Sequence, residues 1–256
     1  MRLIVSLVAV SFFLSCSSSN FVDSERRAED LIQSGQYQKA AKIYEKIVNE
    51  YPKSPEISGA ILRLADLRVS FLGDLVKGLD EYEKVIKLDP FSEAARLAHE
   101  KRALIFQTNN LAQKAIEEYS VLIKFFPSDE YRMQLAEAYI SNKDYDQARI
   151  ELKPFLFPDK QNSGYRERAI FNIAETYYIE GNPSEAIRFY QAYLEVGQEP
   201  ALIPEVELKI ASCLEEMGYL GMSQKYLKKM QEKYPNMEIL SLRLKKLEEQ
   251  GKKTRK

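Results

Sequence analysis

The stretch AETYYIEGNPSEAIRFY, residues 174–190, decides the fold of this chain. Two small residues, Ala174 and Ala186, stand twelve positions apart, with the turn-forming Gly181 between them. A large residue, Tyr190, follows Ala186 by four positions, which places both on one face of a helix. Small side chains let two helices approach closely, and a large neighbour fills the space beside them. The stretch therefore predicts two antiparallel helices joined by a tight turn.

The same pattern occurs six times along the chain, with successive copies 33 to 38 positions apart. The small residue and the large residue four positions later are Ala40 and Tyr44, Gly78 and Tyr82, Ala115 and Tyr119, Ala148 and Leu152, Ala186 and Tyr190, and Ser223 and Leu227. The upstream small residues are Ala28, Ala65 (one place out of register), Ala103, Ala136, Ala174 and Ala211. A glycine or asparagine precedes five of the six copies, at Gly35, Gly73, Asn110, Gly181 and Gly218. A period of this length predicts stacked supersecondary units that share a continuous core.

The pattern resembles the tetratricopeptide (TPR) repeat, a helix–turn–helix unit of about 34 residues. The resemblance implies an all-α fold, a TPR superhelix (α-solenoid) of about six repeats with a C-terminal capping helix. The expected repeats are residues 24–54, 59–91, 96–128, 129–160, 166–199 and 204–236, followed by a cap over 237–250. The array then covers residues 24–250, and a basic tail covers 251–256.

The first fifteen residues form a different kind of segment. Arg2 supplies a positive start, and residues 3–14 are apolar except for two serines. The apolar run is too short to span a bilayer comfortably, which favours a signal peptide over residues 1–15. It ends in FLSC, residues 13–16, followed by three serines. This resembles the lipobox of bacterial lipoproteins, although Phe13 and Leu14 depart from the residues usual there.

The lipoprotein resemblance implies cleavage before Cys16, acylation of that cysteine with chains such as palmitate, and a lipidated tether over residues 16–23. Two or more acyl chains give stable membrane anchoring. Ser17, where an aspartate typically retains lipoproteins in the inner membrane, implies delivery to the outer membrane. The protein is then expected to face the periplasm.

Composition and charge argue against several classes of function. The net charge of −1, with basic residues spread along the chain, lacks the electrostatic footprint of a nucleic-acid-binding protein. The single histidine, His99, has no cluster of metal-ligand spacing around it, and the sequence supports no nucleophile triad. Cys213 is the only thiol left once Cys16 is acylated, and we expect it to be a small, buried apolar residue on a helix. We therefore expect no enzyme activity, no metal and no cofactor besides the lipid.

The TPR resemblance implies a concave groove lined by the first helix of each repeat. The predicted groove residues are Glu29, Leu104, Met133, Glu137, Ile140, Phe171, Glu175, Tyr178 and Glu215. Such a surface suits a protein segment with hydrophobic side chains among basic ones. The alternative that Phe171 and Tyr178 only pack between adjacent helices stays open. A second candidate surface is the proline-rich linker over residues 196–206, for which a plain spacer is the alternative.

A lipidated, periplasm-facing TPR array resembles the BamD (YfiO) family of outer-membrane assembly lipoproteins. The resemblance is strongest over residues 28–90, in Gly35-Gln36-Tyr37 and in Tyr51-Pro52-Lys53-Ser54-Pro55. It implies binding of the partners of the outer-membrane β-barrel assembly machinery. A chain of six even repeats departs from the five repeats typical of that family. Pilotin-like lipoproteins, which bring secretin subunits to the outer membrane for secretin or pilus assembly, and TPR coordinators of envelope constriction are the alternatives.

Overall fold

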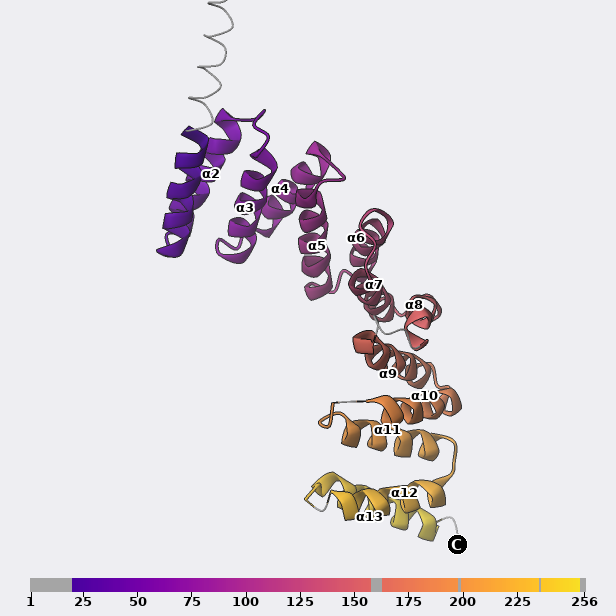
Figure 1. Ribbon diagram of the computed structural model, residues 1–256. Helices are drawn as coiled ribbons and strands as arrows, with labels where there is room; N and C mark the ends of the chain where they lie inside the picture. Colours follow the sequence, from indigo (N-terminus) through magenta and orange to yellow (C-terminus); the bar gives the residue numbers. More distant parts are fainter. Residues whose placement is uncertain (1–19, 158–162, 198, 235, 254–256) are drawn as a thin grey trace, which may run out of the picture. The chain divides into compact units, whose positions relative to one another are not determined.

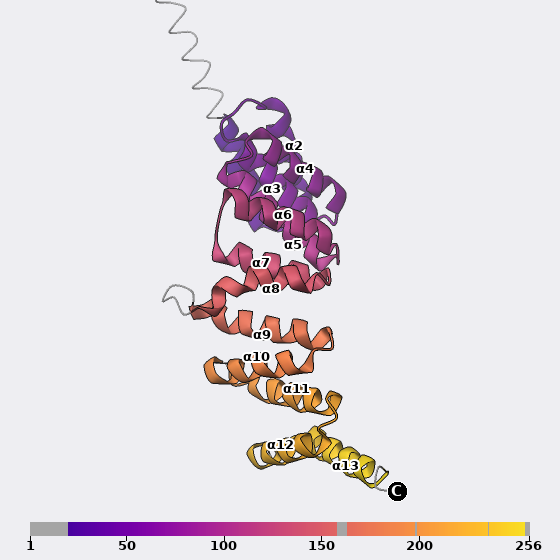
Figure 2. The same ribbon diagram turned by 90° about the vertical axis from the view of Figure 1, so that its right-hand side faces the viewer.

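The computed structural model describes residues 20–157, 163–197, 199–234 and 236–253. All regular elements within these ranges are helices, as Figures 1 and 2 show. Contacts divide the chain after Phe126 into two compact units. The predicted signal peptide, Cys16 and Ser17 lie outside the described residues.

The N-terminal unit contains three helical hairpins. Its helices cover residues 20–33, α2 (Tyr37–Glu50), α3 (Ile57–Ser70), α4 (Leu75–Leu88), α5 (Glu93–Thr108) and α6 (Ala112–Phe125). Each hairpin packs against the next, with α2 on α3 and α4 on α5. The three hairpins correspond to the first three predicted repeats.

The C-terminal unit contains the other three hairpins and one further helix. Its elements are α7 (Asp129–Ser141), α8 (Tyr145–Leu152), the 3-10 helix η1 (Lys153–Leu156), α9 (Ser163–Ile179), α10 (Pro183–Val196), α11 (Ile203–Glu216), α12 (Leu220–Lys233) and α13 (Glu238–Lys253). The last helix, α13, packs against α12 and covers the apolar side of the final hairpin. The predicted all-α TPR solenoid of six repeats with a C-terminal capping helix is therefore confirmed.

The small residues of the repeat occupy the tightest positions in each hairpin. The twelve small residues and the six large ones that the sequence singled out are all buried. In the second hairpin, a Cβ atom added to Gly78 would lie 3.3 Å from the carbonyl oxygen of Ala65 and would collide with Val69. The spacing of small residues therefore sets how closely the two helices of a hairpin approach.

Each hairpin turn contains one residue with a positive φ angle. Five of these residues are the predicted Gly35, Gly73, Asn110, Gly181 and Gly218. The sixth is Lys143, between α7 and α8, with φ of 66°. A side chain on Cβ makes this left-handed conformation unfavourable by roughly 1–2 kcal/mol, and lysine lacks the short polar side chain with which asparagine can offset the cost. The fourth turn is therefore strained, whereas the turns that have glycine at this position are not.

Replacing Lys143 by glycine is expected to stabilise the protein by about 1 kcal/mol, because glycine adopts a positive φ freely. Urea unfolding would measure the change. The matched control is Lys228→Gly, at an exposed position inside α12, which is expected to cost about 1 kcal/mol. Equal destabilisation by both changes would show that Lys143 carries no backbone strain.

The start of the folded chain differs from the prediction. Residues 20–23, expected to belong to the tether, are helical, and Phe21 is only 2% exposed. The Phe21 ring packs edge-on against Tyr51, with 5.8 Å between the ring centroids. Burial of this aromatic side chain against the end of α2 extends the first helix toward Cys16. Among the described residues, no helix combines the length and the apolar character that crossing a membrane requires.

Candidate partner-binding site

Each of the two units carries carboxylates at a recurring position on the first helices of its hairpins. Four of the six repeats have an acidic residue directly after the upstream alanine: Glu29, Asp66, Glu137 and Glu175. Each carboxylate pairs with a cation on the first helix of the next hairpin in the same unit: Arg63 at 3.3 Å, Lys101 at 3.4 Å, Arg168 at 2.6 Å and Lys209 at 2.7 Å, in the same order. We call these four acidic residues the carboxylate row. Within each unit these pairs link successive hairpins, and the paired cations largely neutralise the carboxylates.

Three members of the carboxylate row also accept a hydrogen bond from the large tyrosine of their own hairpin. Tyr44 donates to Glu29 at 2.8 Å, and Tyr190 donates to Glu175. Tyr82 donates to Asp66 in the same way. Burial, together with this hydrogen bond, raises the pKa of each tyrosine well above its usual range. The hydroxyls therefore stay protonated and hold the carboxylates in place.

The acidic groove residues consequently offer less charge to a partner than the sequence suggested. Glu137 accepts hydrogen bonds from both Nε and Nη2 of Arg168, each at 2.7 Å. Glu215 pairs with Arg243 of α13 at 3.0 Å and accepts a hydrogen bond from Ser223. The first role of these carboxylates is to join neighbouring helices.

The apolar residues predicted to line the groove differ in how far they are exposed to solvent. Leu104 is 56% exposed on α5, and Ile140 is half-buried on α7. Met133 is fully buried among the core residues that join α7, α8 and α9, among them Leu152 and Phe155. The prediction that Met133 contacts a partner is therefore wrong, because α9 and η1 cover the face of α7 on which it lies.

Phe171 and Tyr178, the two aromatic residues for which packing was the alternative, are both half-buried against the core of the C-terminal unit. The Phe171 ring lies 5.6 Å from the ring of Tyr193. The ammonium group of Lys209 lies 5.0 Å from the centre of the Tyr178 ring and covers it. Phe171 also borders an open pocket.

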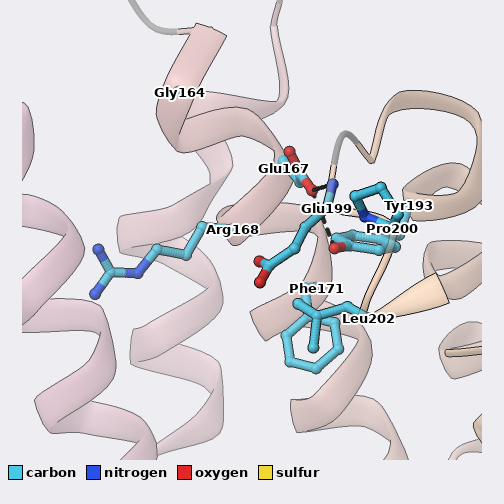
Figure 3. A pocket seen from close by; sticks show the side chains of 8 residues that line it. All are labelled: Gly164, Glu167, Arg168, Phe171, Tyr193, Glu199, Pro200 and Leu202. Carbon is cyan, nitrogen blue, oxygen red and sulfur yellow. Dashed lines mark hydrogen bonds between the residues drawn. The ribbon is translucent and has the colours of Figure 1, made fainter. Parts of the chain in front are cut away.

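That pocket has a volume of about 560 Å³ and lies between α9 and the segment that joins α10 to α11 (Figure 3). Its lining consists of Gly164, Glu167, Arg168, Phe171, Tyr193, Glu199, Pro200 and Leu202. Among the predicted groove residues only Phe171 contributes. The other contributors include Pro200 and Leu202 of the linker that was the second candidate surface. The end of this linker is helical, because α11 begins at Ile203 and Pro204 fits its first turn.

One carboxylate fixes the wall of the pocket. Glu167 of α9 accepts hydrogen bonds from the Tyr193 hydroxyl at 3.0 Å and from the backbone N–H of Glu199 at 3.3 Å. Burial, aided by Glu167, raises the pKa of Tyr193 to about 12, so its hydroxyl remains a donor. The linker is thereby held against α9.

Two chemical regions meet in the pocket. Phe171 and Leu202 supply the apolar part, and the carboxylates of Glu167 and Glu199 supply negative charge. Figure 3 shows Arg168 directed away from these side chains, which agrees with its pairing to Glu137 on α7. Gly164 leaves open space at the edge, since a Cβ there would meet no atom within 4 Å.

His99 and Cys213, the side chains best suited to catalysis or metal binding, are both buried. His99 is buried and lies 2.6 Å from Glu118, which also pairs with Arg102 at 2.9 Å. Cys213 is buried, and burial raises the pKa of its thiol to about 11. Within the described ranges, no group of three or more His, Cys, Asp and Glu side chains is arranged to hold a metal ion.

Comparison with known proteins agrees with this architecture. No curated protein matches the sequence. The structure of YrrB, described as a TPR protein with an unusual peptide-binding site, has a TM-score of 0.56 at 15% identity, covering 80% of this chain and 99% of that one. A MamA protein has a TM-score of 0.55 at 18% identity, covering 72% of this chain and 94% of that one. A chain in the structure of Naa15/Naa10 bound to HypK-THB has a TM-score of 0.52 at 20% identity, covering 82% of this chain and 31% of that one. Residues 26–54 match the tetratricopeptide repeat family model, and the chain as a whole has the fold of TPR proteins.

Proposed function

We propose that this protein is a scaffold that binds an extended segment of a protein partner in the pocket between α9 and the α10–α11 linker. The pocket is the observation that carries the proposal. Its volume of about 560 Å³ falls within the range of roughly 300–1,000 Å³ in which proteins hold small ligands and inserted side chains. Peptide binding by another protein of this fold, YrrB, supports the same use of the solenoid.

The chemistry of the lining selects the partner segment. Phe171 and Leu202 favour an apolar side chain, while Glu167 and Glu199 favour a basic residue next to it. A segment with a large hydrophobic residue flanked by lysine or arginine therefore fits best. The sequence predicted a partner segment of the same kind. The pocket is a smaller site than the groove predicted for it.

We further propose that the scaffold is anchored to the outer membrane through lipid on Cys16, faces the periplasm and serves β-barrel assembly in the manner of the BamD family. The FLSC sequence of residues 13–16, Ser17 and the first-repeat motifs over residues 28–90 support this reading. Secretin delivery by a pilotin-like lipoprotein is the alternative that the experiment below distinguishes.

Changing Cys16 to alanine is expected to abolish acylation, because the thioether to the lipid forms at this sulfur. Radioactive palmitate fed to cells that express the wild type or the variant would measure it. The wild type should be labelled and the variant should not. Equal labelling of both proteins would refute the lipid anchor.

Changing Gly164 to leucine is expected to lower partner capture at least tenfold, because the new side chain occupies the edge of the pocket. Stability should not fall, since Gly164 is a helical residue with open space around it and leucine favours helix by up to about 1 kcal/mol. The matched control is Gly221→Leu, at the second residue of α12, where a Cβ also meets no atom within 4 Å.

The capture experiment uses the immobilised wild type and both variants with detergent-solubilised envelopes, followed by mass spectrometry. Wild type and Gly221→Leu should retain barrel-assembly components or barrel precursors, and Gly164→Leu should not. Secretin subunits captured in the same pattern would favour the pilotin alternative. Identical capture by all three proteins would rule out the pocket as the binding site.

A further inference from the structure

One edge of the N-terminal unit exposes several large apolar side chains. Helices in a hairpin are antiparallel, so the first helices begin, and the second helices end, at this same edge (Figure 1). Val22 is 48% exposed, Leu88 51%, Phe91 66% and Phe125 40%. We call these four residues the apolar edge.

Ring contacts and one hollow lie along the apolar edge. Phe21, next to Val22, packs against Tyr51 at the end of α2. Pro52 and Ile57, on either side of the α2–α3 turn, line a hollow of about 340 Å³ together with Leu88. Phe91 then packs edge-on against Phe125, with 5.0 Å between ring centroids. The strip therefore runs along the N-terminal unit from its first helix to its last.

Cationic side chains border this strip. Lys84 and Lys87 line the same hollow, with side chains 58% and 72% exposed, and the Lys124 ammonium group lies 4.9 Å from the centre of the Phe125 ring. Aromatic and aliphatic side chains flanked by lysine suit the boundary between lipid headgroups and acyl chains. Lys84 also pairs with Glu81 at 3.2 Å and Lys87 with Glu83 at 2.6 Å, and these exposed ammonium groups can exchange their partners for lipid phosphates.

The proposed anchor is close in sequence to the start of this edge. Only three residues separate Cys16 from Asn20, where the first described helix begins. Four residue steps span at most about 14 Å whatever their conformation, so acylated Cys16 would keep the start of that helix at the membrane surface. A cytosolic or periplasmic partner at the same edge would have to compete with the bilayer for it.

We propose that the apolar edge is a membrane-contact surface, on which Leu88, Phe91 and Phe125 insert into the headgroup region of a phospholipid bilayer. This inference rests on the proposed anchor at Cys16. Contact at this edge fixes the orientation of the N-terminal unit on the membrane. The C-terminal ends of α2, α4 and α6 face the lipid, and the hairpin turns with positive φ face away from it.

Fluorescence quenching by brominated lipids tests this orientation. The chain contains no tryptophan, so Phe91→Trp introduces a single probe at the apolar edge. The matched control is Leu111→Trp, which is 44% exposed in the wild type but lies at the α5–α6 turn, on the opposite edge of the same unit. The chain from Cys16 onward is coupled through that thiol to a maleimide-headgroup lipid in vesicles of phosphatidylethanolamine and phosphatidylglycerol. Buried Cys213, whose pKa is raised to about 11, does not compete.

The Phe91→Trp probe should be quenched at least twice as strongly as the Leu111→Trp probe and should shift its emission to the blue on tethering. Equal quenching, or stronger quenching of the Leu111→Trp probe, would overturn the proposed orientation. Circular dichroism confirms that both variants are folded. The chemical tether does not depend on processing in cells, so failure here is distinct from failure of the palmitate experiment.

Discussion

Removing the Arg68 side chain, as in Arg68→Ala, is expected to destabilise the protein by about 3 kcal/mol or more. The guanidinium joins three helices, with hydrogen bonds of 2.5 Å to Glu81 on α4 and 2.8 Å to Glu45 on α2. The Arg68 side chain is 12% exposed and that of Glu81 only 6%. Without Arg68, buried Glu81 is left with the exposed Lys84 as its partner, at 3.2 Å. Breaking a buried pair costs roughly 3–5 kcal/mol. Urea unfolding would measure the loss.

Two further variants show whether that loss comes from the buried charge. Arg188→Ala removes an exposed arginine paired with Glu185 and should cost at most about 1 kcal/mol. Arg68→Met combined with Glu81→Leu removes both charges of the buried pair and should recover most of the stability. A loss for Arg68→Ala no larger than that for Arg188→Ala would contradict the assignment of Arg68 as the link between the hairpins.

Enlarging Ala186 to leucine is expected to destabilise the C-terminal unit by roughly 1–3 kcal/mol, because the added carbons overpack a close helix contact. Ala186 is fully buried and packs with Ala174 and Tyr190 in the core between α9 and α10. The loss would appear in urea unfolding. Gln191→Leu, at an exposed position of the same helix, is the matched control and should change stability by no more than about 0.5 kcal/mol. Equal effects of the two substitutions would mean that the small residue is not required there.

The repeat architecture could be predicted from the sequence because its determinants are local. A small residue such as Ala186 and a turn glycine such as Gly181 recur at fixed spacing, and each has one clear physical role. The turn at Lys143 escaped prediction because lysine carries no preference for positive φ. The surrounding helices impose that conformation, and sequence alone gives no sign of it.

The candidate site was less predictable, because it depends on which side chains neighbouring elements cover. Met133 fits the groove pattern, yet α9 and η1 bury it. Glu137 reads as an available acidic residue, yet Arg168 lies 31 positions away in sequence and pairs with it. The pocket exists because Glu167 holds the linker through the backbone N–H of Glu199. The proline-rich composition of that linker was the only sequence signal for its wall.

Site-specific photocrosslinking in living cells tests the central claim most directly. Benzoyl-phenylalanine replaces Ala201, an exposed residue between the pocket-lining Pro200 and Leu202, in one strain and Gly221 in a matched strain, and adducts are identified by mass spectrometry after irradiation. Ala201 itself does not line the pocket, so the probe leaves the pocket open. Binding in the pocket predicts a discrete adduct with a barrel-assembly component or a barrel precursor at position 201, and none at position 221. The same adducts at both positions, or no adduct at position 201 from a protein that is folded and present at the wild-type level, would contradict it.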